Sequence, residues 1–445
     1  MMKRFPVAEQ TLETFRQEFA ADKALRAAAN AASKTDLADI AFCGMEAARL
    51  HHHFSVEIPT MSATNQKSSG RCWMFAALNV LRERVAAKLN LEQFELSQSY
   101  CAFWDKFERV NYFYDCILDT AELPTDDRTV TYLLQTGVHD GGQWDMFVNI
   151  VKKYGVVPKH AMPETCQSSS TGSMNRLLNT NLKAGAAALR KLCRENAGEA
   201  AVLAKKQELL KQAFDFLCIC YGMPPETFDF EYVDKDKEYH IDRDLTPKSF
   251  FEKYVDMDLD AYLSIIDAPT QDKPYHKMYT VKYLGNVAEG QKVAYLNLPM
   301  EEMKALIIRQ LQAGEVVWFG SDVGKFGDRA DGTWDDKSFE YEALTGLDLS
   351  LTKEERLDYR DSCMCHAMVI TGVNLVDGKP NRWKIENSWG DDRGEKGYYV
   401  ASDSWFDEFV YQAVVRREYL ADKADILKEE PKELAPWDPM GSLAR

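Results

Sequence analysis

A turn of small residues that leads directly into an apolar helix is the feature that most constrains the fold of this chain. Ser68, Ser69 and Gly70 are typical of a tight turn. Apolar side chains then recur every three or four residues, as in a helix that is buried in a core. These side chains are Met74, Leu78, Leu81, Val85 and Leu89. The pattern predicts a buried helix with Cys72 in its first turn.

Cys72 has two interpretations. In the first turn of a helix, unpaired backbone N–H groups and the positive end of the helix dipole favour a thiolate over a thiol, and the thiolate is the attacking form of cysteine. On this interpretation, position alone lowers the pKa of Cys72. Free cysteine is more commonly a small buried hydrophobe, so a nucleophile requires a base and an orienting group elsewhere in the chain.

A candidate base is His366, which lies at the start of an apolar, β-branched run that continues to Gly372 and is typical of an interior strand. A histidine at a strand edge can lean into a cleft, where one ring nitrogen takes the thiol proton and a third group holds the other. The candidate third group is Asn387, on the apolar face of the alternating segment 383–387, because a buried amide needs a partner. Trp389 would shield this hydrogen bond from water.

Four blocks of sequence carry these residues in order. They are residues 65–73, with Gln66 and Cys72; residues 140–145, with Gly141 and Gly142; residues 365–368; and residues 386–390. Together the blocks resemble the bleomycin hydrolase and aminopeptidase C family of papain-like cysteine peptidases, and the similarity extends from about residue 10 to the last residue. The resemblance implies an α+β, papain-like fold of two lobes with an N-terminal arm and a helical insertion.

The predicted mechanism is acyl transfer by a Cys, His and Asn set, with Cys72 on the helical lobe facing the other two on the β lobe. The Cys72 thiolate attacks the carbonyl carbon of the first peptide bond, and His366, first its imidazolium partner, then protonates the leaving amine. The resulting thioester is hydrolysed by water that His366 activates. Asn387 orients His366. The side-chain amide of Gln66 and the backbone N–H of Cys72 form the oxyanion hole.

Candidate substrate-binding residues lie in three parts of the chain. Gly141 and Gly142 would let an extended substrate backbone approach and hydrogen-bond as a strand does, and a plain turn is the alternative for them. Trp389 adjoins the predicted catalytic pair. Ala444 and Arg445 end the chain, and the resemblance implies that their arm lies in the active-site cleft, where a terminal carboxylate pairs with a substrate's free α-amino group.

The C-terminal arm separates exopeptidase from endopeptidase activity. Pro436, Trp437 and Pro439 predict an extended, docked segment, and a frayed terminus is the alternative. A carboxylate in the cleft excludes long chains, so the resemblance implies an aminopeptidase. It leaves open whether Arg445 is removed and Ala444 is the mature end.

The spacing of the candidate residues predicts the domain organisation. Cys72 and His366 are 366 − 72 = 294 positions apart, whereas His366 and Asn387 are 387 − 366 = 21 apart. The long interval predicts inserted domain material, and the short one predicts two neighbouring strands. The expected units are an N-terminal arm (1–60), a helical lobe (61–166), an insertion of helices and then mixed strands (167–299), a β lobe (300–420) and a C-terminal arm (421–445).

Local patterns fill in this outline. Residues 177–220 are rich in Ala, Leu, Lys and Glu and predict two or three helices. Strand-like runs follow at 228–233, 276–283 and 293–298. The β lobe is expected to begin with a helix over 300–313 and a buried strand over 315–320.

Composition predicts a cytoplasmic protein that does not bind nucleic acid. The chain has 54 Lys and Arg against 70 Asp and Glu, a net charge of 54 − 70 = −16, which repels phosphate backbones. The sequence has no run of 18 apolar residues and no signal-peptide core at its start, so no membrane contact is expected. Its ten cysteines are spread without a small-domain framework, as expected for reduced thiols.

No metal or other cofactor is predicted. Three adjacent histidines, residues 51–53, cannot all face one point on a regular element and are assigned to the surface. Cys363, Cys365 and His366 resemble a soft-metal cluster, but the sequence has no second Cys/His group at zinc spacing.

Three functions remain open. The leading one is a cysteine aminopeptidase that acts on peptides with a free N-terminus and also on bleomycin-like amides. The second is a papain-like endopeptidase. The third is an inactive cage with a binding role, against which the intact set of Gln66, Cys72, His366 and Asn387 argues. The resemblance also implies a homo-hexamer.

Overall fold

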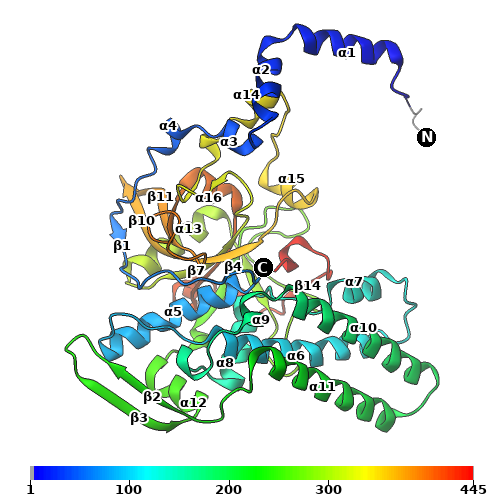
Figure 1. Ribbon diagram of the computed structural model, residues 1–445, viewed down its shortest axis with the longest axis vertical. Helices are drawn as coiled ribbons and strands as arrows, with labels where there is room; N and C mark the ends of the chain where they lie inside the picture. The colour runs from blue at the N-terminus through cyan, green and yellow to red at the C-terminus, as the bar shows by residue number, and fades with distance from the viewer. Residues whose placement is uncertain (1–4, 444–445) are drawn as a thin grey trace.

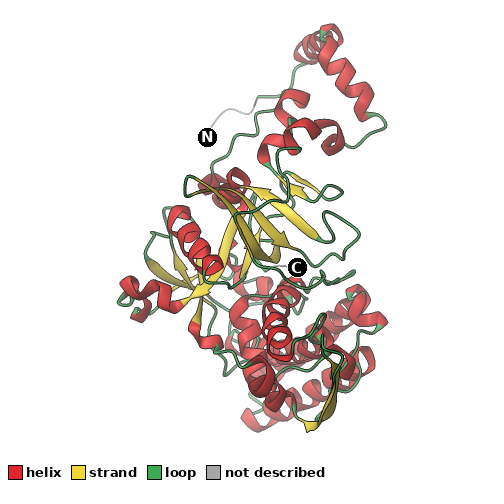
Figure 2. Ribbon diagram, turned by 90° about the vertical axis from the view of Figure 1, so that its left-hand side faces the viewer, coloured by secondary structure: helices red, strands yellow, loops and turns green. Residues whose placement is uncertain are grey.

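The computed structural model describes residues 5–443, which form two lobes and an arm. Helices gather in the lower lobe of Figure 1 and most strands in the upper lobe, and the perpendicular view in Figure 2 shows the same division. The expected two-lobe α+β architecture is therefore confirmed. Within residues 5–443, no helix is both long enough and apolar enough to cross a membrane.

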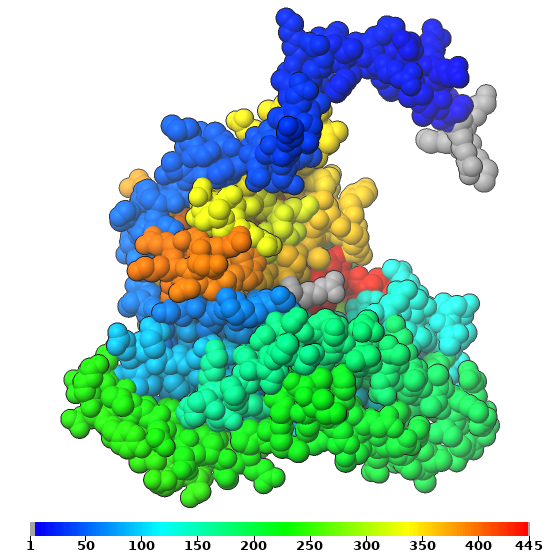
Figure 3. Space-filling model, in the orientation of Figure 1, coloured from blue at the N-terminus to red at the C-terminus, as the bar shows by residue number. Residues whose placement is uncertain are grey.

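The arm precedes both lobes. Its helices are α1 (Glu9–Ala21), α2 (Lys23–Ala32), α3 (Leu37–Ala41) and α4 (Gly44–Ala47). Asp22 caps α2 by accepting hydrogen bonds from the backbone N–H groups of Ala24 and Leu25, which favours the turn between the first two helices. α1 contains no buried residue, and Figure 3 shows it projecting from the body of the molecule.

The helical lobe is built around α5 (Cys72–Leu89), and the predicted helix is confirmed with Cys72 as its first residue. Residues 72–79 are all buried, and Asn90 ends the helix in the left-handed conformation, with φ 52°. The other helices of the lobe are α6 (Gln98–Asp119), α7 (Arg128–Thr136), α8 (Trp144–Tyr154), α9 (Cys166–Ser169), α10 (Gly172–Arg194), α11 (Glu199–Tyr221) and α12 (Pro247–Phe250).

The insertion contains two long helices and a hairpin. α10 and α11 are the helices predicted within residues 177–220, and both pack on α6 in one apolar cluster. The hairpin consists of β2 (Phe228–Val233) and β3 (Tyr239–Leu245), which pair with each other in a separate two-stranded sheet. The predicted strand at 228–233 is thus confirmed.

A twelve-stranded sheet forms the β lobe. Its order is β14-β5-β6-β4-β13-β7-β10-β11-β12-β9-β8, and β1 pairs with β10 outside this path. The strands are β1 (Val56–Glu57), β4 (Tyr262–Ile266), β5 (Lys277–Val281), β6 (Ala294–Asn297), β7 (Val317–Ser321), β8 (Gly327–Asp328), β9 (Thr333–Trp334), β10 (His366–Val376), β11 (Lys379–Glu386), β12 (Tyr398–Ser402), β13 (Val410–Arg416) and β14 (Lys432–Leu434). The predicted strands around 276–283, 293–298 and 315–320 are confirmed as β5, β6 and β7.

Helices cover one face of this sheet. α13 (Met300–Gln312), which confirms the helix predicted over 300–313, and α16 (Asp403–Phe409) share an apolar cluster with the inner residues of the strands. α14 (Tyr341–Thr345) and α15 (Lys353–Asp358) lie between β9 and β10 in the chain. β10 has β7 on one side and β11 on the other, so it is the interior strand that its apolar sequence predicts.

The boundary expected at residue 299 is wrong. β4, β5 and β6 precede it but lie in the same sheet as β7 and β13. β4 pairs along its whole length with β13, from Tyr262 opposite Arg416 to Ile266 opposite Gln412, and all its residues are buried. A strand buried on both faces requires neighbours and cover that a separate insertion would not supply. The sheet of the β lobe therefore begins at Tyr262.

α5 joins the two lobes. The indole Nε1–H of Trp318 in β7 donates to the carbonyl of Trp73 at 3.0 Å. Further along α5, Arg82 and Asn79 both donate to Oε1 of Glu386 at 2.8 Å, and Glu386 is the last residue of β11. The helix that begins with Cys72 is thus attached directly to the two strands that flank β10.

Candidate active site

Asp140 of the helical lobe holds residues on both sides of Cys72. The N–H of Gly70 donates to Oδ2 of Asp140 at 2.9 Å, and the indole N–H of Trp73 donates to the Asp140 carbonyl at 2.6 Å. Both Cys72 and Trp73 are fully buried. The turn predicted from Ser68 to Gly70 therefore delivers Cys72 to the start of α5 in a fixed position.

Asp140 remains ionised in this buried setting. Burial pushes its pKa upward, but the ion pair with Lys106 and hydrogen bonds from Lys106, Thr171 and Asn175 outweigh that effect and hold the pKa well below its ordinary value. The Lys106 ammonium lies 2.6 Å from Oδ1 of Asp140. The charge is thus neutralised locally, and the carboxylate keeps its hydrogen bond to the turn.

His366 and Asn387 come together at one end of two neighbouring strands. His366 is the first residue of β10, and Asn387 directly follows β11. Nε2 of His366 lies 2.9 Å from Oδ1 of Asn387, and the two side chains are buried. The ring of Trp389 lies 4.8 Å from the imidazole, centroid to centroid, where it covers the pair. With Nε2 held, Nδ1 is the ring nitrogen left to exchange a proton.

Gln66 is attached to the same strand end. Its backbone N–H donates to the carbonyl of Ser388 at 2.8 Å, and the hydroxyl of Ser388 donates to its Oε1 at 2.7 Å. Its Nε2 donates to the carbonyl of Ser69 at 2.6 Å. The carboxamide is therefore oriented from both ends, beside the turn that carries Cys72.

The sulfur of Cys72 lies at the start of β10. Backbone N–H groups of Ala367, Trp73 and Cys72 itself hydrogen-bond to it and lower its pKa, but burial has the larger effect and raises the pKa of Cys72 to about 12. The expectation that helix position alone lowers this pKa is therefore wrong, because the sulfur is withdrawn from water. Since Ala367 follows His366, Cys72 and His366 belong to one site.

Burial also disfavours the charged form of His366. Burial lowers its pKa to about 4, the hydrogen bond to Asn387 acts in the opposite direction, and the nearby charge of Arg329 lowers it further. Burial therefore acts against charge on both partners, because it raises the pKa of Cys72 and lowers the pKa of His366.

The site opens on one side into a polar cleft of about 670 Å³. Its lining comes from the turn before α5, the segment after β7, the start of β10 and the loop after β11. The residues are Asn65, Gln66, Lys67, Ser68, Ser69, Gly70, Val323, Gly324, Arg329, Cys365, His366, Trp389, Asp392 and Arg393. A substrate in this cleft would lie between Gln66 and His366.

The C-terminal segment occupies the other side of the site. After β14, which pairs in parallel with β5, the ring of Trp437 packs against the guanidinium of Arg128 at 3.8 Å. The carbonyl of Ser442 accepts a hydrogen bond from Nε2 of Gln143 at 2.9 Å, and its hydroxyl donates to the carbonyl of Met364 at 2.9 Å. Gln143 follows Gly142, and Met364 lies two residues before His366, so the segment spans both lobes.

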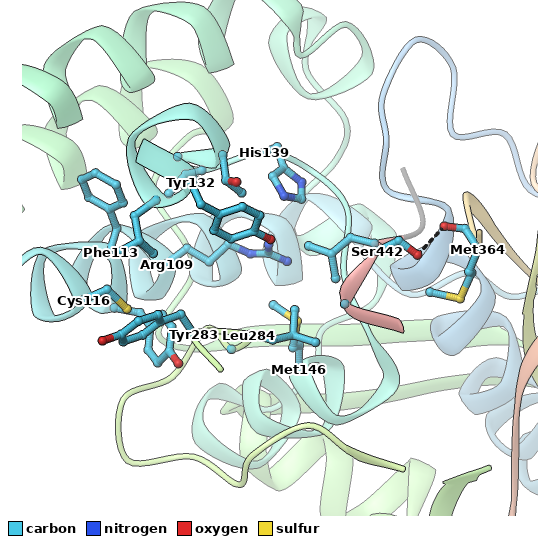
Figure 4. A pocket seen from close by; sticks show the side chains of 18 of the residues that line it. Arg109, Phe113, Cys116, Tyr132, His139, Met146, Tyr283, Leu284, Met364 and Ser442 are labelled. Carbon is cyan, nitrogen blue, oxygen red and sulfur yellow. Dashed lines mark hydrogen bonds between the residues drawn. The ribbon is translucent and has the colours of Figure 1, made fainter. Parts of the chain in front are cut away.

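A cavity of about 300 Å³ lies under this segment (Figure 4). Arg109, Tyr132, Leu284 and other side chains line it, and residues 441–443 form one wall. Figure 4 shows Ser442 between the cavity and Met364, with its hydroxyl hydrogen bond dashed. The chain's own C-terminal segment thus takes up space next to the candidate catalytic residues.

Gly142 is required by packing. A Cβ at this position would lie 2.4 Å from the ring of Trp73, which is far too close. Gly141 is buried as well, and its carbonyl accepts a hydrogen bond from Arg109 at 2.5 Å. The helical lobe therefore explains the glycine at 142 without a substrate, whereas the neighbouring Gln143 contacts the C-terminal segment directly.

Two of the candidate substrate-binding residues, Ala444 and Arg445, lie outside the described residues. Of the histidines assigned to the surface, the rings of His51 and His53 contact each other, with centroids 4.9 Å apart. Within residues 5–443 there is no group of three or more His, Cys, Asp or Glu side chains placed to hold a metal ion.

Comparison with known protein families decides where this site belongs. The model of a family described as "Peptidase C1-like family" matches residues 6–441. The chain belongs to the Peptidase C1-like family. The match of this Peptidase C1-like chain includes the arm, both lobes and most of the segment after β14.

Individual relatives agree. An aminopeptidase C of Lactobacillus delbrueckii subsp. lactis is 49% identical over 98% of both chains, and one of Lactobacillus helveticus is 51% identical over 88% of both. The crystal structure of PepW from Lactobacillus rhamnosis HN001 has 50% identity and a TM-score of 0.97 over 99% of both chains. This Peptidase C1-like protein is thus a cysteine-type aminopeptidase with the papain-like fold expected from its sequence blocks.

Several residues of the site were not predicted from sequence. Asp140 lies in a block of sequence that resembles the family, but no sequence pattern marks its partner Lys106. Ser388 directly follows Asn387, and this position after the strand is the only sequence feature that points to its contact with Gln66. Arg329 lies in a segment without a recognisable motif, yet it faces the cleft of this Peptidase C1-like protein.

Proposed function

We propose that this protein removes N-terminal residues from peptides through a covalent thioester on Cys72, with His366 as base and acid and Asn387 as its orienting group. The observation that carries the proposal is the buried hydrogen bond of 2.9 Å between His366 and Asn387, next to the start of α5. This bond fixes the ring so that Nδ1 is available for the thiol proton.

The proton moves when the substrate is attacked. Burial raises the pKa of Cys72 and lowers the pKa of His366, so it favours the uncharged pair in the free enzyme. As the Cys72 sulfur bonds to the substrate carbonyl carbon, its proton passes to His366, and the imidazolium then gives it to the leaving amine. Water deprotonated by His366 attacks the thioester, releases the amino acid and restores the thiol.

The oxyanion is stabilised by Gln66 and by the backbone N–H of Cys72. An amide nitrogen carries two hydrogens, and Gln66 uses one of them toward the carbonyl of Ser69. The second is directed to the carbonyl oxygen of the substrate as it becomes negative. Removal of one such donor typically costs about 10²–10³ in kcat.

The C-terminal segment restricts the enzyme to free N-termini. Ser442 contacts Gln143 and Met364 on the two sides of the site, so a long chain cannot pass there. We propose that Ala444 and Arg445, which lie outside the described residues, provide a terminal carboxylate that pairs with the α-amino group of the substrate. Gly141, Gly142 and Trp389 complete the walls of the binding site, with Gly142 acting through its contact with Trp73.

The remaining parts of the proposal rest on the family. They are hydrolysis of bleomycin-like amides, assembly into a homo-hexamer in which the arm of residues 1–60 contacts other subunits, a cytoplasmic location and no binding of nucleic acid. The net charge of −16 supports the last of these. A papain-like endopeptidase is the alternative, and the contacts of Ser442 speak against it.

The proposal is tested with aminoacyl fluorogenic amides that carry either a free or an acetylated N-terminus. We expect the full chain to hydrolyse the free substrate and to leave the acetylated one intact, because the terminal carboxylate requires an ammonium partner. A chain that lacks residues 441–445 should lose this selectivity by about tenfold or more, the worth of one charged hydrogen bond. The measurement is the ratio of kcat/KM for the two substrates.

A Ser442→Ala variant is the graded control, because it removes the hydroxyl bond to Met364 and keeps the carbonyl bond to Gln143. It should shift the ratio less than the truncation does. Unchanged selectivity after truncation would mean that the C-terminal segment does not determine exopeptidase activity.

A further inference from the structure

The cleft next to His366 carries a group of positive side chains, here called the cationic rim: Lys67, Arg329 and Arg393. All three line the cleft and are exposed. The acidic residue of the same lining is Asp392, so the cleft has a positive balance, although the whole chain carries a net charge of −16. A local excess of cations in a strongly acidic protein attracts anionic ligands to that place.

The members of the cationic rim have no acidic partners among residues 5–443. Other exposed cations of the chain pair readily, as Lys152 does with Asp260 at 2.7 Å. Arg329 instead stacks on Trp389, with its guanidinium carbon 4.6 Å from the ring centroid. The stacking holds a guanidinium beside the imidazole of His366, whose ring lies 4.8 Å from the same indole.

The position of the C-terminal segment indicates which end of a bound peptide lies over the cationic rim. Residues 441–443 lie on the side of Met364 and Gln143, where the substrate's N-terminus is proposed to bind. The part of the peptide that leaves therefore lies on the opposite side, over the rim. An extended chain spans about 3.3–3.6 Å per residue, so the C-terminus of a di- or tripeptide stays close to the scissile bond, in the cleft that Trp389 and Arg329 line.

We propose that the cationic rim binds the α-carboxylate of short peptides, so that di- and tripeptides with a free C-terminus are the favoured substrate class. This inference rests on the proposed function. The planar guanidinium of Arg329 matches a carboxylate in a bidentate manner, and Arg393 and Lys67 add charge at the edges of the cleft. An acidic side chain just beyond the scissile bond also carries a carboxylate that the rim could bind. The test distinguishes this side-chain carboxylate from the α-carboxylate.

The test compares kcat/KM for the tripeptide Leu-Gly-Gly and its C-terminal amide, with Leu-Glu-amide as the acidic side-chain arm. Because the rim is exposed, we expect the free acid to be preferred roughly three- to tenfold at low ionic strength. The combination of Lys67→Gln, Arg329→Gln and Arg393→Gln should bring this ratio close to one, and Arg393→Glu alone, which leaves Lys67 and Arg329 in place, should lower it only part of the way. Lys379→Gln, an exposed cation at the far end of β11, should leave the ratio at its wild-type value.

Each result decides something. A wild-type ratio of one, or a ratio that survives the triple substitution, overturns the inference. Leu-Glu-amide and free Leu-Gly-Gly are each compared with Leu-Gly-Gly amide. If both are preferred to the same extent, the rim recognises acidic side chains, and the α-carboxylate assignment is overturned. If an aminoacyl fluorogenic amide, which carries no carboxylate, is hydrolysed while the ratio stays at one, only the rim fails. If neither it nor the peptides are hydrolysed, the proposed function fails as well.

Discussion

Cys72→Ala should reduce kcat/KM for an aminoacyl amide by about 10⁴-fold or more, because the only atom proposed to bond to the substrate is then missing. His366→Ala should have a similar effect, since the thiol of Cys72 then has no proton acceptor. The two residues act as a unit, so the double variant should be no slower than either single variant. Initial rates with a fluorogenic leucyl amide measure all three.

Cys101→Ala is the matched control. Cys101 is also a fully buried cysteine of a helix in the same lobe, so its loss creates a comparable cavity without removing the nucleophile. It should keep activity within a few-fold of the wild type. If Cys72→Ala retained activity like that of Cys101→Ala, Cys72 would be a structural residue and its assignment as nucleophile would be withdrawn.

Glu386→Ala should lower the free energy of unfolding by about 3–5 kcal/mol at pH 8, the usual cost of leaving a buried partner charge unpaired. Glu386 accepts hydrogen bonds from Arg82 and Asn79 of α5, and the side chains of Glu386 and Arg82 are 1% and 3% exposed. Its loss removes the link between α5 and the strand that leads to Asn387. Urea unfolding followed by tryptophan fluorescence measures the effect.

Glu315→Ala is the control for this comparison. Glu315 pairs with Arg416, but these side chains are 25% and 27% exposed, so water can replace the lost contact. The expected cost is about 1 kcal/mol or less. Equal losses for Glu315→Ala and Glu386→Ala would show that the contact between α5 and β11 has no special weight.

The Glu386 contact also makes stability depend on pH. Burial raises the pKa of Glu386 to about 7, and the charge of Arg82 only partly counteracts this. Between pH 4.5 and 7 the folded chain therefore keeps a proton that the unfolded chain loses, and this contribution to stability falls as the pH rises. Residue 386 cannot titrate in Glu386→Gln. The free energy of unfolding of the wild type should therefore fall by roughly 2–3 kcal/mol relative to that of the variant between pH 4.5 and 7. If the difference between the two unfolding free energies does not change with pH, the pKa of Glu386 is not raised.

Local patterns account for much of what could be predicted. The helix at Cys72 and the strand at His366 each follow from a run of residues whose period or apolar character is visible within the run itself. Asn387 was found because an amide on an apolar face demands a partner, and the structure puts that amide 2.9 Å from His366. Such signals need no knowledge of the rest of the chain.

Contacts between distant segments were harder to predict. The alternation of β11 separates Glu386 from the face of Asn387, but it gives no sign that α5 covers Glu386 and supplies Arg82. The pKa of Cys72 was wrongly expected to be low because the helix position is visible in the sequence, whereas its burial under β10 is not. The boundary at 299 failed for the same reason, since the pairing of β4 with β13 is non-local.

Trapping the thioester tests the central claim most directly. The protein is mixed with an excess of a leucyl ester, quenched in acid within milliseconds to seconds, digested and examined by mass spectrometry. We predict that the peptide containing Cys72 gains the mass of one leucyl group, that the gain appears before steady state and that hydroxylamine removes it. Turnover of the ester with no acyl group on Cys72 at any time, or with the acyl group on another residue, would contradict the account.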